Sequence, residues 1–415
     1  MPEPQSLRVF TRELKLTRFD LMRHLPKNAQ VFVRNGQGLV GFGEATRLAA
    51  VGDGRIASLA LAWNELVAAA HVEDQVNLPG TGLVGFGSIA FADSSVAQSV
   101  IVVPKVLLGL RDDRAWLTFV DCDEVDVEDF WNNEISYGAG AVSGGVRFEA
   151  GAQSSAAFED SVVSAVAAIA AGEVEKVVLA RDLVAKVPAD FDLRGALERL
   201  AQRYASCWVY SVDGTFGASP ELLVRVAHGQ VSARVLAGTA GRGTEATIDT
   251  AIGAALASSH KNRIEHAFAV DSLVQSLAEF CEHVDADSEP FSLPLPNLWH
   301  LASDVHGVLR QDSSVLDVAA ALHPTAAVAG TTRAAALKVI ERLEPFDRLR
   351  YAGPVGWIGA DGDGEWAIAL RGAQYDAEAA TITAFAGCGI VAESEPAAEL
   401  AETELKFRPI IDALS

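Results

Sequence analysis

The stretch Glu-Lys-Val-Val-Leu-Ala-Arg (175–181) opens the part of the chain whose pattern decides the fold. Its central apolar run predicts a buried strand, and the strand begins with Lys176. A lysine at the start of an apolar strand must either reach water or have its ammonium desolvated, and desolvation lowers the lysine pKa toward the range of a useful base. Lys176 is therefore the first candidate catalytic residue.

Helix and strand patterns alternate around this strand in the downstream part of the chain. A helix is expected over Glu159–Ala171, ended by Gly172, and it leads into a strand over Lys176–Val187. Further helices are expected over Leu193–Tyr204, Lys261–Glu279, Thr332–Leu343 (stopped by Glu344-Pro345) and Ala397–Leu414, and further strands over Val209–Val212, Leu222–Val226, Val231–Val235, Gly356–Ile358, Glu365–Leu370 and Ile382–Ala386.

The first 150 residues carry short apolar runs that predict strands, with one helix among them. The strands are expected over Gln30–Arg34, Gly38–Phe42, Leu83–Phe91, Ser99–Val103 and Ala115–Val120, and the helix over Ile56–Ala70. No low-complexity linker divides the chain. We therefore expect a mixed α/β (α+β) protein, with a β-rich N-terminal subdomain over residues 1–150 and a second subdomain over 151–415, packed as one unit.

The charge balance of the chain is strongly acidic. Lysine and arginine number 33 against 55 aspartate and glutamate residues, which gives a net charge of −22 over 415 residues. We expect no nucleic-acid or membrane partner, because phosphate backbones and anionic lipids repel such a surface. An anionic small molecule would need positive charge concentrated locally.

The cysteines and the N-terminus indicate a cytoplasmic protein. The four cysteines lie far apart without a CxxC pair, which argues against a zinc site or a disulfide framework and fits a reducing compartment. The sequence MPEPQSLRVFTRELKL lacks an apolar signal-peptide core, so we expect none, and the most hydrophobic stretch, near Ser99–Leu110, is too short to span a bilayer.

Seven segments, taken in order, carry a family resemblance. They are EKVVLAR (175–181), GASPELL (217–223), LAGTAGRG (236–243), KNRIEH (261–266), LWHLASDVHG (298–307), LHPTAAVAG (322–330) and AGCGIVAESEPAAELAETELK (386–406). Together they resemble the chorismate-utilising enzymes, which include anthranilate synthase component I, aminodeoxychorismate synthase component I, isochorismate synthase and salicylate synthase. The resemblance covers roughly residues 156–412. It implies a chorismate-binding fold of large antiparallel and mixed sheets with helices outside, and a catalytic role for the 151–415 subdomain.

Three glutamates are candidate metal ligands. Glu399 and Glu402 are three residues apart, so a helix places them on one face. By itself this pair is as typical of a solvated acidic surface. The resemblance implies that Glu265 and Glu402 bind Mg²⁺ directly and that Glu399 lies nearby or acts through water, since carboxylates suit a hard cation.

The resemblance also assigns residues to the carboxylates of the substrate, chorismate. Arg371 and Lys406 match positions that grip a carboxylate, although each is otherwise typical of a surface ion pair. Gly387 and Gly389 leave backbone N–H groups open to an anion. Tyr351 resembles a tyrosine that donates a hydrogen bond to a carboxylate, or is a half-buried strand aromatic.

Lys176 and Glu221 form the implied acid–base pair. In the family, Glu221 faces the C4 hydroxyl of the ring and Lys176 lies on the opposite side, where it can deprotonate a water that attacks C2. The amine-forming branches typically carry glutamine in place of Lys176, and aminodeoxychorismate synthases often carry a nucleophilic lysine where this chain has Ala237. Both differences favour water as the nucleophile.

Three further positions are implied to contact or orient the substrate. Thr239 and His300 resemble family residues near the ring, and Ala327 leaves room beside it. An isolated histidine is more often a core residue than a catalyst, so His300 is expected to orient the substrate. The chain departs from the family pattern at Cys388, where Gly-Ala-Gly is usual.

These matches imply an Mg²⁺-dependent isochorismate synthase that interconverts chorismate and isochorismate. Salicylate synthase, which adds pyruvate elimination, is the close alternative. The amine-forming synthases are a third possibility, and a non-catalytic binding protein on the same scaffold is a fourth. We expect a monomer that needs no glutamine amidotransferase subunit. Menaquinone and siderophore synthesis are both open as destinations of the product.

Overall fold

The computed structural model describes residues 6–15, 20–121, 127–134, 145–243, 245–294 and 298–415. The chain forms two compact units. Unit 1 comprises residues 1–221, 323–360 and 367–415, and unit 2 comprises residues 222–322 and 361–366. None of the described helices has both the length and the apolar character needed to cross a bilayer.

A sheet of 13 strands forms the main part of unit 1, as far as the described residues show. Its order is β10-β11-β23-β22-β13-β12-β2-β3-β8-β9-β1-β5, with β19 beside β11. The strands are β1 (Arg8–Leu14), β2 (Gln30–Arg34), β3 (Gln37–Phe42), β5 (His71–Asp74), β8 (Val106–Arg111), β9 (Arg114–Val120), β10 (Glu149–Ala150), β11 (Lys176–Lys186), β12 (Trp208–Val212), β13 (Thr215–Ser219), β19 (Gly330–Thr331), β22 (Gly372–Asp376) and β23 (Thr381–Ile390).

Unit 1 also holds a smaller run of strands and the helices that flank both. The antiparallel pairs are β20–β6, β6–β7 and β7–β4. These elements are β4 (Thr46–Ala50), β6 (Val84–Ser88), β7 (Ser99–Val103), β20 (Pro354–Gly359), η1 (Leu21–His24), α1 (Arg55–Ala69), α2 (Val127–Glu134), α3 (Ser155–Ala170), α4 (Arg194–Arg203), α8 (Arg333–Leu343) and α9 (Pro396–Leu414).

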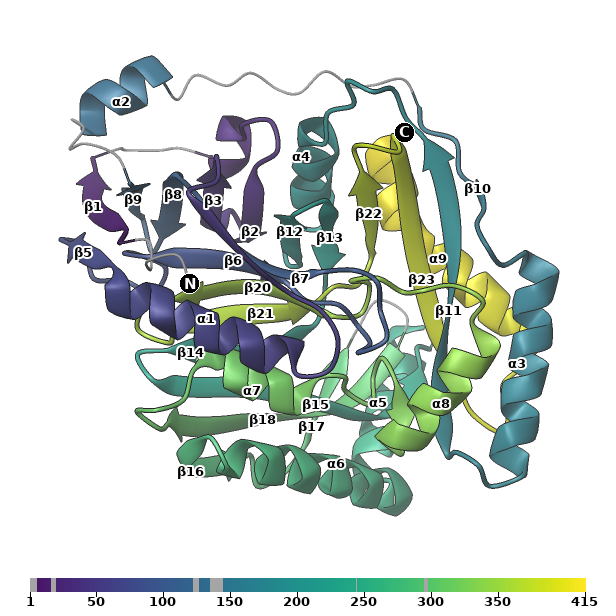
Figure 1. Cartoon of the computed structure of the whole chain (residues 1–415). Helices are drawn as coiled ribbons and strands as arrows, with labels where there is room; N and C mark the ends of the chain where they lie inside the picture. The colour runs from purple at the N-terminus through teal and green to yellow at the C-terminus, as the bar shows by residue number, and fades with distance from the viewer. Residues whose placement is uncertain (1–5, 16–19, 122–126, 135–144, 244, 295–297) are drawn as a thin grey trace. The chain divides into compact units, whose positions relative to one another are not determined.

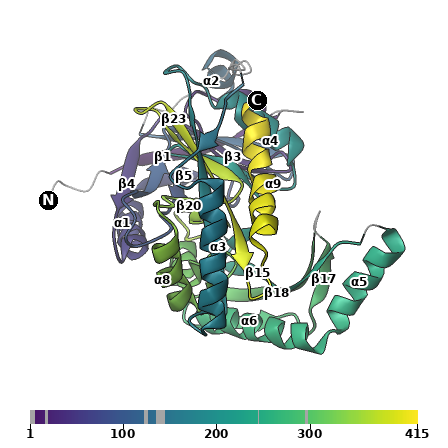
Figure 2. The same ribbon diagram turned by 90° about the vertical axis from the view of Figure 1, so that its right-hand side faces the viewer.

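The antiparallel pair β11–β23 brings distant parts of the sequence together. Ten residues pair along it, from Val177 opposite Ile390 to Lys186 opposite Thr381. Helix α9 follows β23 and packs against both β23 and α3, so the yellow C-terminal helix lies beside the teal α3 in Figures 1 and 2. The N-terminal turn of α3 is capped by the Ser154 hydroxyl, which accepts a hydrogen bond from Ala157 N at 3.2 Å.

The core of unit 1 explains why its strands read as continuous apolar runs rather than alternating ones. Strands β6, β7 and β20 are buried at every position, because both of their faces are covered. Apolar side chains of α9, such as Phe407 and Ile410, join those of β2, β22 and β23 in one core cluster. Continuous burial of this kind gives most of the stabilising free energy of a domain.

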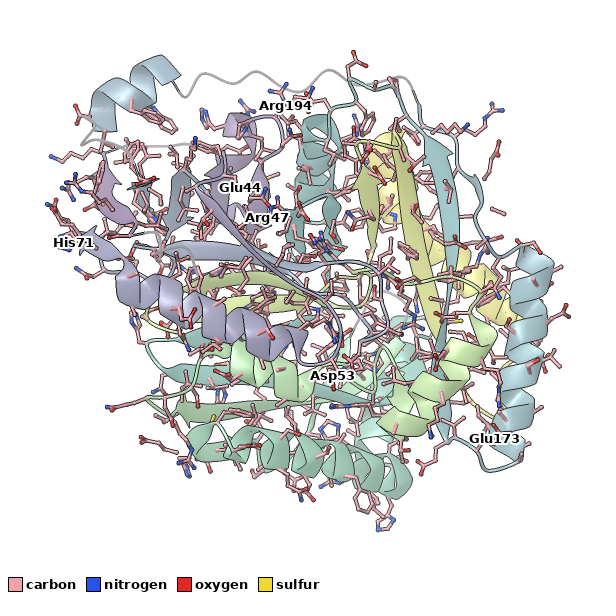
Figure 3. The ribbon with its side chains drawn as sticks, viewed as in Figure 1. Glu44, Arg47, Asp53, His71, Glu173 and Arg194 are labelled. Atoms are coloured by element: carbon pink, nitrogen blue, oxygen red, sulfur yellow. The ribbon has the colours of Figure 1, made fainter. Side chains whose placement is uncertain are left out.

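A charged network that runs from the surface to a buried arginine also links segments of unit 1. Arg47 binds Glu44 and Asp213, each at 2.7 Å, and Figure 3 shows Glu44 and Arg47 side by side on the same stretch of chain. Arg350, only 6% exposed, binds the second carboxylate oxygen of Asp213 at 2.7 Å. Asp213 therefore links residues that lie more than 100 positions apart in the sequence.

Unit 2 consists of a few antiparallel strands with helices that pack on them. Strand β15 (Gln230–Gly241) pairs with β18 (Leu298–Leu309), and the helix α6 (His260–Ala278) packs on both. The other elements of unit 2 are β14 (Leu222–Ala227), α5 (Ala246–Ser258), β16 (Cys281–Ala286), β17 (Phe291–Pro294) and α7 (Val315–Leu322), while β21 (Gly364–Ile368) begins in unit 2 and ends in unit 1.

The predicted mixed α+β class is confirmed. Several elements match their predicted bounds within one residue, among them Ser99–Val103, α1, α4 and α6. The predicted strands Val231–Val235 and Ile382–Ala386 are confirmed but are longer, as β15 and β23, and helices α5 and α7 were not predicted. The division into subdomains at residue 150 stays a prediction. The boundaries of the two compact units lie elsewhere in the sequence, because unit 2 consists of residues 222–322 and 361–366.

Candidate active site

Lys176 is the first residue of β11, at a point where the strand is bonded on both sides. Its backbone pairs with Thr331 of β19, and the neighbouring Val177 pairs with Ile390 of β23. A Cβ on Gly330 would come 2.1 Å from the Lys176 carbonyl oxygen, and the φ of Gly330 is 134°, so only glycine allows this approach. Lys176 therefore cannot shift without breaking a ladder on either side.

The ammonium of Lys176 lies close to several charges. Burial lowers the pKa of Lys176; Glu221 and Glu402 oppose this effect, and Lys406 adds to it. A Cβ on Gly389 would lie 3.0 Å from Lys176 Cε, so a larger residue there would press on the side chain. Because the pKa is lowered, the neutral amine forms at a lower pH than in free lysine, which suits a general base.

Glu221 lies between β13 and β14, directly after Pro220. Its backbone is fixed: Glu221 N donates to Ser219 Oγ at 3.2 Å, and Ile368 N donates to the Glu221 carbonyl at 3.0 Å. Burial raises the pKa of Glu221, although Lys176, Lys406 and Arg371 each lower it. The raised pKa keeps the carboxyl protonated to a higher pH than usual, which suits a general acid.

Helix α9 presents Glu402 and Lys406 on one face, one turn apart. Lys406 Nζ bonds Glu402 Oε1 at 2.5 Å and the Gly387 carbonyl at 2.8 Å. Lys406 thus joins the helix to β23, opposite the strand that begins with Lys176. Both side chains remain partly exposed, at 46% for Glu402 and 26% for Lys406, so they can still reach a ligand.

Glu399 lies in the first turn of α9 and contacts β23. Burial raises the pKa of the Cys388 thiol, and the nearby Glu399 carboxylate raises it further because it accepts a hydrogen bond from the thiol. The residue that departs from the family pattern, Cys388, is 1% exposed. It therefore serves as a buried neutral donor to Glu399.

Arg371 lies within electrostatic reach of both Glu221 and Tyr351. The Tyr351 ring stacks on Phe385 with centroids 5.3 Å apart, and its hydroxyl would lie 3.3 Å from a Cβ on Gly387. Burial raises the pKa of Tyr351 to about 12, against the lowering effect of Arg348 and Arg371. Tyr351 therefore stays protonated and is able to donate a hydrogen bond to an anion.

Ala327 is exposed in a turn of the predicted LHPTAAVAG segment. The turn is closed by Val328 N and Ala329 N, which donate to the Thr325 carbonyl at 3.1 and 3.0 Å. His323, in the same segment, is buried and bonds the Phe91 carbonyl through Nε2 at 2.9 Å. Burial lowers the pKa of His323 to about 4, so it is a neutral structural residue.

The remaining predicted site residues, Thr239, Glu265 and His300, belong to unit 2. Thr239 of β15 pairs through its backbone with His300 of β18, and Glu265 lies in α6. The side chains of Thr239 and Glu265 lie outside the described residues. Next to Glu265, the buried His266 binds the Ala237 carbonyl through Nδ1 at 3.1 Å and Ser303 Oγ through Nε2 at 2.9 Å.

Unit 1 therefore brings together most of the predicted site. Residues from β11, β23, α9 and three loops lie within electrostatic reach of one another. The sequence interpretation missed the buried pair Glu344–Arg348 and the anchoring histidine His266. The available signal was two opposite charges four residues apart in EPFDR (344–348), but other charged residues flank them, so the sequence does not mark this pair as buried.

Three comparisons with known proteins show what the whole chain is similar to. The sequence profile of a family described as chorismate binding enzyme matches residues 9–415. A Mycobacterium tuberculosis protein provisionally named isochorismate synthase MenF is 42% identical over 255 residues, which cover 59% of this chain and 68% of that protein. Bacillus subtilis isochorismate synthase DhbC is 36% identical over 269 residues, 62% of this chain and 67% of that protein. The solved structure of Escherichia coli MenF, described as a menaquinone-specific isochorismate synthase, has the same fold, with a TM-score of 0.76 at 23% identity over 99% of this chain and 94% of that chain.

Proposed function

Because this chain belongs to the chorismate-binding enzyme family, we propose that it is an isochorismate synthase, which interconverts chorismate and isochorismate. The observation that carries the proposal is the pair Lys176 and Glu221. The two residues lie within electrostatic reach, and their pKa values move in opposite directions, down for the lysine and up for the glutamate. An amine base and a carboxylic acid with these shifts suit the exchange of one hydroxyl for another.

In the proposed reaction, Lys176 takes a proton from a water that attacks C2 of the ring. Glu221 gives a proton to the C4 hydroxyl, which leaves as water while the ring double bonds rearrange. One water is consumed and one is released, so the reaction is an isomerisation. Glutamine in place of Lys176 would be unable to accept the proton, which separates this reaction from the amine-forming ones.

All three proposed donors are carboxylates, and carboxylate oxygens suit a hard cation such as Mg²⁺. Glu399 and Glu402 offer carboxylate oxygens from one helix, and Glu265 is the third proposed ligand. No three acidic, histidine or cysteine side chains gather into a metal-binding group within the described part of the chain. Bound to these glutamates, Mg²⁺ would neutralise their mutual repulsion and hold the ring carboxylate of the substrate.

The second carboxylate of chorismate is assigned to positive and hydrogen-bonding groups of unit 1. Arg371 and Lys406 supply charge, Tyr351 supplies a hydroxyl, and Gly387 and Gly389 allow a close backbone approach. Thr239, His300 and Ala327 complete the proposed contacts with the ring.

The proposal extends to the setting of the enzyme. We propose that it acts as a monomer in the cytoplasm and needs no glutamine amidotransferase subunit, because water rather than ammonia is the nucleophile. To test whether an amidotransferase subunit is needed, the products formed from chorismate are compared with and without added ammonium salt. Formation of anthranilate or aminodeoxychorismate with ammonium would contradict this part of the proposal.

The whole proposal is tested by incubating the purified chain with chorismate and Mg²⁺ and separating the products by chromatography. We expect isochorismate in equilibrium with chorismate, and no conversion when EDTA replaces Mg²⁺. Salicylate as the main product would assign the chain to the salicylate branch instead. Binding of chorismate in a calorimeter without any product would indicate a non-catalytic protein.

A further inference from the structure

Glu344 and Arg348 form a fully buried ion pair in unit 1 that the proposed chemistry does not use. Their side chains are 3% and 2% exposed. Arg348 Nε bonds Glu344 Oε2 at 2.8 Å, and Nη2 bonds Glu344 Oε1 at 2.5 Å, so the two planar groups meet in a fork. The guanidinium also lies 4.4 Å from the centre of the Phe91 ring.

The pair completes the edge of β11 where its neighbouring strand ends. Strand β19 is bonded only to the first residues of β11, and Val178 N donates to Ala329 O at 2.9 Å. Beyond that point, Arg348 Nη2 donates to Val178 O at 2.7 Å, and Ala180 N donates to Glu344 Oε1 at 2.7 Å. The two side chains thus bond backbone groups that would otherwise be buried without partners.

The same arginine reaches two other segments of the candidate site. Arg348 Nη1 donates to the Val328 carbonyl at 2.9 Å, next to Ala327. The Arg348 carbonyl accepts a hydrogen bond from Tyr351 N at 2.9 Å. One residue therefore contacts the strand that begins with Lys176, the turn that holds Ala327 and the turn that holds Tyr351.

Stability alone is a poor explanation for this arrangement. A buried ion pair must repay the cost of desolvating both charges, and apolar residues of similar size often stabilise a fold as well or better. Apolar side chains, however, offer no bonds to the backbone of β11 or of the turn that holds Ala327. The ion pair therefore differs from an apolar pair by the hydrogen bonds that its side chains make to the backbone.

We propose that Glu344 and Arg348 are positioning residues, which fix the geometry of Lys176 relative to Tyr351 and Ala327. The inference rests on the proposed function for its catalytic consequence. A misplacement of about 1 Å far from the reacting atoms can lower a rate by about 10²-fold. We expect loss of the pair to lower kcat by that order, with a smaller change in the KM for chorismate.

The test compares Arg348→Met, Glu344→Gln and the double variant Glu344→Leu/Arg348→Met with Arg342→Gln as a matched control. Arg342 lies in the last turn of α8, and its exposed ion pair with Glu173 measures 3.0 Å. We expect the control to keep wild-type kcat. Each single variant leaves one buried charge without its partner and could fail to fold. The double variant removes both charges, so it is expected to fold even if a single variant does not.

Two readouts separate positioning from a merely structural role. Partial unfolding lowers the amount of active protein, but it leaves KM and the pH profile of the surviving molecules unchanged. We expect the pH dependence of kcat to shift in the folded double variant. We also expect a shift in the pH at which an amine-reactive reagent labels Lys176, read by mass spectrometry against the exposed Lys186.

The labelling readout needs no turnover, so it distinguishes the two proposals. Wild-type protein that forms no isochorismate refutes the proposed function, while the labelling comparison still decides the positioning role. A folded double variant with wild-type kcat and an unshifted Lys176 labelling profile would overturn the inference.

Discussion

The two units hold their candidate metal-binding glutamates by different means. In unit 1, Glu402 is held by a charge, because Lys406 bonds both its carboxylate and the Gly387 carbonyl. In unit 2, Glu265 lies on α6, which is anchored by the neighbouring His266 through hydrogen bonds to Ala237 and Ser303. Burial lowers the pKa of His266, so this anchor is a neutral ring.

The difference shows what each kind of anchor can do. A charged anchor sets the electrostatics of its surroundings, and Lys406 lowers the pKa values of both Lys176 and Glu221. A neutral imidazole fixes the position of a helix without adding charge, and its burial makes the protonated form unfavourable. The charged anchor in unit 1 therefore changes the pKa values of the candidate catalytic residues, whereas the anchor in unit 2 only holds the helix that carries Glu265.

The largest expected effect breaks the chemistry of unit 1 and leaves unit 2 intact. Lys176→Gln should lower the kcat for isochorismate formation by ~10²–10⁴-fold, since glutamine cannot take the proton from water. Circular dichroism and thermal melting should match the wild type. Lys186→Gln, at the exposed far end of the same strand, is the control. Near-wild-type turnover of Lys176→Gln would refute the assignment of the base.

A second prediction asks whether both units contribute to one metal site. Glu402→Gln and Glu265→Gln should each raise the Mg²⁺ concentration needed for half-maximal activity by at least about 10-fold, since losing even an indirect partner of a metal typically costs 10–100-fold. Calorimetric titration with Mg²⁺ should show the same weakening without turnover. Glu404→Gln, exposed on α9, is the control. Unchanged Mg²⁺ binding by Glu265→Gln would remove α6 from the site.

A third prediction concerns acid stability and compares a buried histidine from each unit. The folded chain keeps His323 neutral down to pH about 4, whereas the unfolded chain binds a proton near pH 6.5. The contribution of neutral His323 to the free energy of unfolding is therefore fully present above pH 6.5. It is lost as the pH drops toward 4, and the loss is about 2 kcal/mol at pH 5. His266 acts in the same direction in unit 2.

Urea unfolding at pH 7 and pH 5 measures this effect. His323→Gln should lose less stability than the wild type over this range, because glutamine does not titrate and can still donate to the Phe91 carbonyl. His266→Gln is the matched variant in unit 2. If His323→Gln and the wild type lose the same amount, the acid sensitivity has another source.

A fourth prediction compares one buried hydrogen bond that supports α9 with one that supports α6. Thr403, which follows Glu402, accepts a hydrogen bond from Arg181 Nη1 at 3.3 Å, and Ser303 Oγ bonds His266 Nε2 at 2.9 Å. Thr403→Val and Ser303→Ala should each cost about 1–3 kcal/mol, since each leaves a buried polar group without its partner. Both costs are read from urea unfolding. A cost near zero for either would show that its bond does not anchor the helix.

Much of the fold was predictable from local patterns. Strands buried on both faces, such as Ser99–Val103, read as continuous apolar runs, and α1, α4 and α6 show helical periodicity with clear ends. The strand β16, CEHVDA, was missed because it is mostly exposed and polar, so no burial pattern marks it. Helix α5 is rich in small residues without a strong apolar face, and β15 and β23 continue beyond their apolar cores through glycine-containing segments.

The candidate site also has a part that the sequence could suggest and a part that it could not. Through the family resemblance, the order and spacing of motifs named Lys176, Glu221 and the acidic residues of α9 as candidates, and their roles stay predictions. Motif order could not predict that Lys406 bonds the Gly387 carbonyl, or that the Glu344–Arg348 pair bonds the backbone of β11. These bonds join separate segments of the chain, and no local pattern records such a pairing.

The amino-acid sequence by itself determined which chemical groups this protein carries and the class of fold that receives them, because composition, periodicity and motif order are local properties of the chain. Only the tertiary structure decided the state of those groups. The lowered pKa of Lys176 and the raised pKa of Glu221 arise from burial and from charges on other elements, and both exist only once β11, β23 and α9 are packed together.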